Sequence, residues 1–153
     1  MIWQIVNALP GHIPHIAANM RQADQKEVMA SHGHSPELAL QSSLNHSVLA
    51  WTCLVRNKPA FMWGVCPLRA VLGLEGSPWL LGTDDVLEVR RDFLKFSPRY
   101  ISKMQSVFPK LWNYVHADNK VSQRWLKWCG FKMANAAETY GINNELFYRF
   151  WRE

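Results

Sequence analysis

The chain has 153 residues, a hydrophobic share of 48% and a net charge of +5, which suit one folded domain with a substantial core. This composition excludes an intrinsically disordered chain, and no apolar run approaches the roughly 18 residues of a membrane-spanning helix. Three cysteines, Cys53, Cys66 and Cys129, lack CxxC spacing and are predicted to be buried free thiols. Because the N-terminus has no signal-peptide features, we expect a protein that stays inside a cell or inside a particle assembled there.

The first half of the chain is predicted to form a strand, two helices and a hairpin. Pro10 and Gly11 end the first strand, and Ser35 followed by Pro36 is a typical helix start. Short loops are predicted over 31–34 and, after the hairpin, over 67–77. The predicted elements are a strand over 1–9, helices over 12–30 and 35–45, and strands over 48–56 and 60–66.

The second half alternates strands and helices before a final pair of strands. Thr83 or Asp84 is the candidate cap of a short helix, and Ser97-Pro98 either kinks or restarts the long helix that follows. The predicted elements are a strand over 79–82, a helix over 91–108, a strand over 111–117, a helix after Asp118 or Asn119, and two strands within 131–153.

The stretch from Leu111 to Phe131 is the most informative part of the chain. Its strand is apolar on both faces, which is typical of a strand in the middle of a covered sheet. Asn119 is a candidate cap for the following helix, and Gly130 suits the left-handed residue that ends one. This succession, with ten residues between Asn119 and Gly130, resembles the second half of the acyl-CoA N-acyltransferase (GNAT) domain.

The resemblance implies an α/β fold in a single domain over residues 1–153. We expect a GNAT-like mixed central sheet of about six to seven strands flanked by about four helices. It also implies that acetyl-CoA would lie in a wedge between the fourth and fifth strands, with its pyrophosphate on backbone N–H groups where the next helix starts. The implied cofactor-binding residues are Asn119, Arg90, Arg91, Leu81 and Gly82. For Asn119, a plain helix cap is the alternative.

Two parts of the family's motif set are absent. The pyrophosphate motif, Arg/Gln-x-x-Gly-x-Gly/Ala, relies on glycines that let backbone approach phosphate closely, but this chain has no glycine between Gly82 and Gly130. Many family members place a tyrosine seven residues after the asparagine, where it protonates the departing thiolate. Here that position is Leu126, which cannot donate a proton. The resemblance therefore predicts a degenerate acetyl-CoA site.

A general base in this family is a carboxylate or histidine near the fourth and fifth strands. His116, near the end of the strand over 111–117, is the candidate catalytic base, and a solvated strand end is its alternative interpretation. Other carboxylates in the region are Asp84, Asp85 and Glu88, of which the two aspartates suit helix caps. We expect no metal site, because His32-x-His34 has no Cys or carboxylate to complete a ligand set.

Basic residues follow the fourth strand and gather again near the last helix. With the tryptophans between them they could form a nucleic-acid surface, but a solvated helical face is the commoner explanation, so we do not expect a nucleic-acid partner. These residues are Arg90, Arg91, Lys95, Arg99, Lys103, Arg124, Lys127 and Lys132, with Trp125 and Trp128.

A narrower resemblance comes from residues 79–84 and 108–115, which are similar to small acetyltransferase-like proteins of short-tailed bacteriophages. Some members of that family are described as internal virion or morphogenesis proteins. The resemblance implies a phage-encoded virion, morphogenesis or host-interaction protein, with phage or host proteins as partners and the host cytoplasm or the phage particle as its location. The alternative is an active N-acetyltransferase that acts on a protein or small-molecule amine, with Arg90, Arg91 and Asn119 holding the cofactor and His116 as base.

Overall fold

The computed structural model describes residues 2–68 and 73–153. No helix in this part of the chain is long and apolar enough to cross a membrane. The elements are β1 (Trp3–Asn7), a 3₁₀ turn (Pro10–His12), α1 (Ile13–Ala18), α2 (Gln22–His32), α3 (Pro36–His46), β2 (Leu49–Val55), β3 (Lys58–Pro67), β4 (Glu75–Gly82), a second 3₁₀ turn (Asp84–Val89), α4 (Arg90–Val107), β5 (Lys110–His116), α5 (Lys120–Trp128), β6 (Lys132–Met133), β7 (Glu138–Tyr140) and β8 (Glu145–Arg152).

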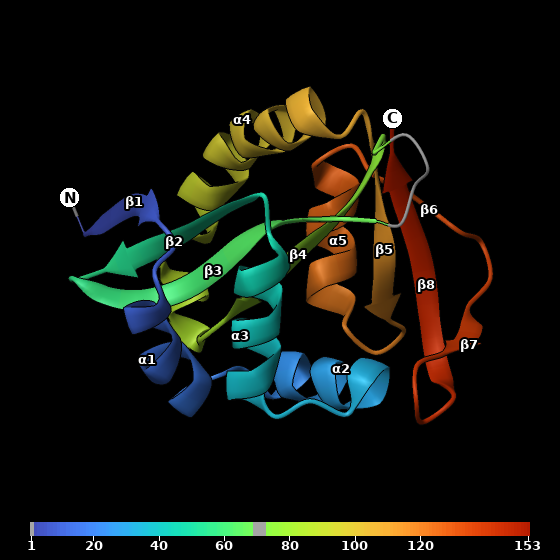
Figure 1. Ribbon diagram of the computed structural model, residues 1–153, viewed down its shortest axis with the longest axis horizontal. Helices are drawn as coiled ribbons and strands as arrows, with labels where there is room; N and C mark the ends of the chain where they lie inside the picture. Colours follow the sequence, from blue (N-terminus) through green and yellow to red (C-terminus); the bar gives the residue numbers. More distant parts are fainter. Residues whose placement is uncertain (1, 69–72) are drawn as a thin grey trace.

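The described strands form one mixed sheet of eight, drawn in Figure 1. Its main path runs β1-β2-β3-β4-β5-β8-β6, and β7 pairs with β8. Only the pair β4–β5 is parallel. A parallel pair needs a long crossover, which the second 3₁₀ turn and α4 supply here.

Helices cover both faces of the sheet, as the alternation of side chains along β3 shows. Phe61, Trp63 and Val65 face a core built with α4 and α5, whereas Met62 faces a second core built with α1, α2 and α3. The strand β5 lies between β4 and β8, inside the sheet. The mixed α/β fold class and the central position of this strand, both predicted from sequence, are confirmed; the structure has eight strands and five α-helices.

The helix predicted over 12–30 is wrong as a single element. The chain forms α1 and α2 instead, and breaks between them where Met20 makes an isolated bridge with Thr83. The N–H of Arg21 also donates to the carbonyl oxygen of Gly82, at 2.9 Å. These contacts are long-range, so helical periodicity could not reveal them. The predicted loop over 31–34 is also wrong in part, because α2 continues through His32.

The second half needs two corrections and settles one open alternative. β4 begins at Glu75, inside the loop predicted over 67–77, of which residues 69–72 lie outside the described residues. Of the two alternatives for Ser97-Pro98, a restart of the helix is excluded, because α4 is one helix with Pro98 inside it. The C-terminal segment forms three strands rather than two.

The cysteines and the end of α5 agree with the sequence. All three cysteines are free thiols, two of them buried and Cys66 half-buried. Burial raises the pKa of the Cys53 thiol to about 12, so this group is not a reactive nucleophile. Gly130 follows α5 with a φ of 87°, the left-handed conformation that was predicted to end this helix.

Gly141, with a φ of 80°, gives a test of how the turn after β7 packs on α2. A Cβ at this position would overlap the carbonyl oxygen of Ala30 in α2, whereas one at Gly130 would meet only the end of the Arg152 side chain. Both alanine substitutions cost about 1 kcal/mol for the left-handed backbone. Only Gly141→Ala adds a backbone overlap, so it should lower the free energy of unfolding in urea further than Gly130→Ala. Equal losses would contradict this packing.

Candidate functional site

A gap opens between β4 and β5. Their ladder contains only two pairs, Glu75 with Lys110 and Gly76 with Leu111, and stops there. Pro78, two residues further along β4, has no N–H and cannot donate to β5. Beyond this point each strand needs other partners for its backbone groups on that side, because unpaired backbone in an interior is costly.

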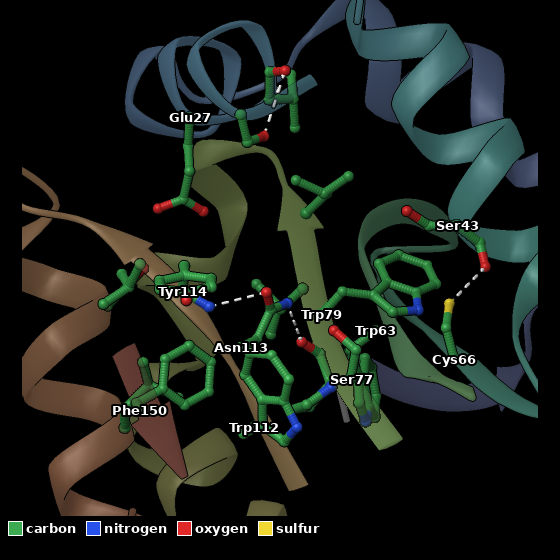
Figure 2. A pocket seen from close by; sticks show the side chains of 18 of the residues that line it. Glu27, Ser43, Trp63, Cys66, Ser77, Trp79, Trp112, Asn113, Tyr114 and Phe150 are labelled. Atoms are coloured by element: carbon green, nitrogen blue, oxygen red, sulfur yellow. Dashed lines mark hydrogen bonds between the residues drawn. The ribbon is translucent and has the colours of Figure 1, made fainter. Parts of the chain in front are cut away.

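The side chain of Asn113 bridges the two strands at the start of the gap. Its Nδ2 donates to the carbonyl oxygen of Pro78 at 2.9 Å, and its Oδ1 accepts from the N–H of Tyr114 at 2.8 Å. Figure 2 shows this amide between β4 and β5. One side chain thus takes the place of ladder bonds on both strands.

Two carboxylates of α2 bind the far ends of the same strands. Asp24 Oδ2 accepts from the N–H of Gly82, at the end of β4, at 3.0 Å. One helical turn later, Glu27 Oε1 accepts from the N–H of His116, at the end of β5, at 2.8 Å. In Figure 1, α2 lies beyond the arrowhead of β5, and Figure 2 shows Glu27 directed from α2 into the gap.

Both carboxyl groups titrate close to neutral pH. Burial raises the pKa of Asp24 to about 6, although Arg21, 3.4 Å away, and the N–H of Gly82 oppose the shift. Burial also raises the pKa of Glu27 to about 7, against the opposing effect of the His116 N–H. At pH 7 Glu27 is therefore present in both its charged and its neutral form, as a general base requires.

A cavity of about 670 Å³ fills the gap and extends between the helices on both sides. Among the lining residues that the structure describes, Glu27 is the only Asp, Glu, Lys or Arg. The indole nitrogen of Trp125, also in the wall, is buried without a hydrogen-bond partner in the described structure. Aromatic residues dominate the wall around the gap, including Trp63, Trp79, Trp112, Tyr114, Tyr140 and Phe150. This lining suits a neutral or cationic ligand with an apolar body, rather than a polyanion.

His116, the predicted base, is buried and held by both ring nitrogens. The N–H of Asp118 donates to Nδ1 at 3.1 Å, so the ring proton is on Nε2, which lies 2.8 Å from Oε1 of Glu145. Its ring also packs edge-on against Phe147. The role of His116 as base remains a prediction. The group of His116 that contacts Glu27 is the backbone N–H, not the imidazole ring.

Asn119 lies at the same place. It caps α5, since its Oδ1 accepts from the N–H of Ser122 at 3.4 Å, and its Nδ2 points to Glu27 Oε1 at 3.5 Å. Leu126, at the position of the missing tyrosine, is buried in the cavity wall. Tyr114 and Tyr140 stack in the wall with ring centroids 4.0 Å apart, and Tyr100 is a third phenol that lines the cavity.

The other predicted cofactor residues are not gathered at one point. Leu81 is buried in the core beneath α1 and α3 and also lines the cavity, and Gly82 is bound through its N–H and its carbonyl oxygen to the segment that starts α2. Arg90 and Arg91 are exposed at the start of α4. The structure therefore brings Asn119 and His116 to Glu27, and leaves the two arginines on the surface.

The residues present fit an acyl-CoA only at its uncharged end. The gap and the cavity could hold an uncharged chain, but the turn after β4 starts with Asp84 and Asp85, where a pyrophosphate would need positive charge. The N–H of Asp85 is already bound by the Thr83 hydroxyl, at 3.3 Å. In the first turn of α4, Phe93 stacks on Trp125 of α5 at 5.1 Å and 15°, and both rings line the cavity.

Sequence reasoning missed Asp24, Glu27 and Asn113. A weak signal existed for Asn113, a polar residue in the middle of an otherwise apolar strand, since such a residue needs an internal partner. Asp24 and Glu27 are spaced one helical turn apart, but this spacing is equally common on solvated helices. Only the packing of α2 against the strand ends distinguishes them.

Comparison with solved structures identifies the fold. The chain is similar over 98% of its length to an acetyltransferase of the GNAT family from Streptococcus pneumoniae (98% of that chain, TM-score 0.59, 10% identity). It is similar to a ribosomal-protein-alanine N-acetyltransferase from Brucella melitensis (97% and 98% covered, TM-score 0.70, 12% identity) and to a Bacillus subtilis acetyltransferase in complex with CoA (99% and 97% covered, TM-score 0.65, 8% identity). No family model and no curated protein matches the sequence. The chain has the GNAT fold.

The two raised carboxyl pKa values predict how stability depends on pH. Folding raises the pKa of Asp24 from 3.8 to about 6 and that of Glu27 from 4.5 to about 7, so the folded protein binds more protons than the unfolded chain in this window. The free energy of unfolding therefore falls as pH rises from about 4 to about 7. Glu27→Gln should remove about 3 kcal/mol of this fall, measured by urea unfolding between pH 4 and pH 8.

The control for this prediction is Glu37→Gln, which neutralises an exposed carboxylate of α3. It should leave the wild-type pH dependence unchanged. Parallel curves for the wild type and Glu27→Gln would show that the Glu27 carboxyl is not shifted as its burial requires.

Proposed function

We propose that this chain is a GNAT-fold binding protein with a degenerate acetyl-CoA site, rather than an acetyltransferase. The observation that carries the proposal is that the chain's own groups occupy the open edges of β4 and β5. Asp24 binds the N–H of Gly82, Asn113 binds across the start of the gap, and Glu27 binds the N–H of His116. A cofactor would have to displace these bonds to use the same edges.

The charges around the cavity support the same conclusion. The start of the helical segment after β4 carries two carboxylates instead of a glycine cradle, and the described part of the cavity wall contains no Lys or Arg. A polyanion such as CoA therefore meets repulsion at one end and no counter-charge inside. The cavity is better suited to a neutral or cationic ligand.

We propose further that the protein is phage-encoded and serves in the virion, in morphogenesis or in interaction with the host. Support for this comes from the sequence alone, through the likeness of residues 79–84 and 108–115 to small proteins of short-tailed phages. Phage or host proteins would then be its partners, in the host cytoplasm or the particle. Loss of the motif that binds the cofactor fits a role in which the fold serves as a scaffold for binding other proteins.

A second function, N-acetyl transfer to a protein or small-molecule amine, is favoured by one observation. Glu27 projects into an aromatic cavity with a carboxyl pKa of about 7, which suits a base that takes a proton from an ammonium group. In that case the general base would be Glu27, whose carboxylate faces the cavity, rather than His116. Arg90, Arg91 and Asn119 would be the contacts to the cofactor.

Isothermal titration of the purified protein with acetyl-CoA and with CoA distinguishes the two functions. We expect no saturable heat up to millimolar concentrations of either compound, because the phosphates would meet Asp84 and Asp85 after β4 and no Lys or Arg in the described cavity wall. The Bacillus subtilis acetyltransferase that was solved with CoA is a suitable positive control. Micromolar binding together with turnover on any amine would overturn the proposed function.

If turnover is found, the second function makes its own prediction. Glu27→Gln should lower kcat/KM by about 10²–10⁴-fold, because the amide cannot accept the proton. Glu37→Gln, an exposed change of the same chemistry, should leave kcat/KM at the wild-type value. Full activity after substitution of both Asn119 and His116 would remove those two residues from the site.

A further inference from the structure

The helices α4 and α5 carry more positive charge than the whole chain. They contain eight of its 17 Lys and Arg residues and one of its 12 Asp and Glu residues. Their combined charge of +7 exceeds the net charge of +5 for the whole chain, so the remainder is net negative. The positive charge of this protein is therefore concentrated in two elements rather than spread over its surface.

The cations of these two helices lack ion-pair partners. Elsewhere Arg21, Lys26, Arg56 and Lys110 each lie within 4.0 Å of a carboxylate oxygen. In the described parts of the chain none of the eight basic residues of α4 and α5 does so, and all eight are exposed. The only acid on these helices, Asp92, accepts a hydrogen bond from the indole of Trp3, at 2.9 Å. These cations are free to bind an external anion.

The positive charges lie on two helices that contact each other. Arg91, Lys95, Arg99 and Lys103 follow one another at intervals of four residues along α4, a stripe about 18 Å long at the rise of a helix. Phe93 of α4 stacks on Trp125 of α5, so the cations of α5 belong to a helix that packs against α4. The α4/α5 cationic surface is defined by Arg90, Arg91, Lys95, Arg99, Lys103, Lys120, Arg124 and Lys127.

An aromatic ring lies within this surface. Trp128 is 67% exposed, the most exposed of the large hydrophobic residues in the described structure. Its indole N–H donates to the carbonyl oxygen of Leu94 in α4, at 3.4 Å, which holds the ring at the seam between the helices. An indole this exposed contributes little to the hydrophobic core, but its face is available for stacking.

We propose that the α4/α5 cationic surface binds single-stranded nucleic acid, with phosphates on the Lys and Arg side chains and a base stacked on Trp128. Cations that follow a backbone, combined with an aromatic platform, are the usual means of binding single strands without sequence preference. A duplex buries the faces of its bases and would leave Trp128 unused. The inference reverses the expectation from sequence, since exposure and the lack of ion pairs become visible only in the fold, and it does not depend on the function proposed for the cavity.

The test is fluorescence anisotropy of a labelled 20-nucleotide poly(dT) strand with the full chain. We expect saturable binding at 50 mM salt that weakens at least tenfold at 200 mM, because each phosphate contact releases counterions. Lys95→Glu/Arg99→Glu should weaken binding by about tenfold or more and should reduce the slope of log affinity against log salt. Lys58→Glu, an exposed and unpaired lysine of β3, should change affinity less than about twofold.

Trp128 provides a second, separable readout. Trp128→Ala should weaken binding by about five- to a hundredfold while the salt slope stays at the wild-type value, because stacking releases no counterions. Trp128→Phe should restore most of the loss. All these residues are exposed, and far-UV circular dichroism with urea unfolding of each variant would exclude a folding defect as the cause.

Several results would overturn the inference. These are no binding at 50 mM salt, equal weakening by Lys58→Glu, tighter binding to a duplex of the same length, and equal binding to phosphatidylserine vesicles. Displacement of the strand by micromolar CoA would also overturn it, by assigning the surface to cofactor phosphates. Absence of CoA binding in the calorimetric experiment would support the degenerate cofactor site, and strand binding in the anisotropy experiment would separately support this inference.

Discussion

The structure depends on how the chain satisfies backbone groups where β4 and β5 part. A parallel pair that stops after two residue pairs leaves strand edges inside the molecule, and a buried amide without a hydrogen-bond partner lowers the free energy of unfolding. Here side chains replace the missing hydrogen bonds of the ladder. Asn113 serves both strands at the start of the gap, and α2 supplies a carboxylate to the far end of each, through Asp24 and Glu27.

This arrangement couples the fold to the chemistry of its cavity. The same bonds that hold the gap open place Glu27 in a mostly apolar wall and raise the pKa of its carboxyl. The carboxylates thus cost stability when charged, yet they bind the strand ends in the absence of any ligand. A fold that in other proteins is found with CoA is here completed by its own side chains.

Charge is divided between the interior and the surface. Among the described residues, the cavity wall contains one acid and no Lys or Arg, whereas the exposed faces of α4 and α5 contain eight basic residues without ion-pair partners. Anions are therefore attracted to the outside of these helices and are not matched by the cavity. Phe93 and Trp125 belong to the same two helices, and their stacked rings line the cavity.

The sequence alone determined the α/β class, most of the element order and the identity of β5 as an inner strand followed by a capped helix that ends at Gly130. These features depend on local patterns: apolar runs, a cap at Asn119 and a left-handed glycine. The sequence also showed that the glycine cradle and the usual tyrosine are absent, since each absence can be read at a fixed spacing.

Only the tertiary structure decided where the helix predicted over 12–30 breaks, where β4 begins, and which carboxylates face the gap. Asp24 lies 58 residues from Gly82 along the chain, and Glu27 lies 89 residues from His116. Helical periodicity places both acids on a helix but cannot say what that helix packs against. The exposure of the basic residues on α4 and α5 has the same origin. Whether a Lys or Arg is paired depends on side chains that only folding brings near, so the partners of a charge cannot be read from its neighbours in sequence.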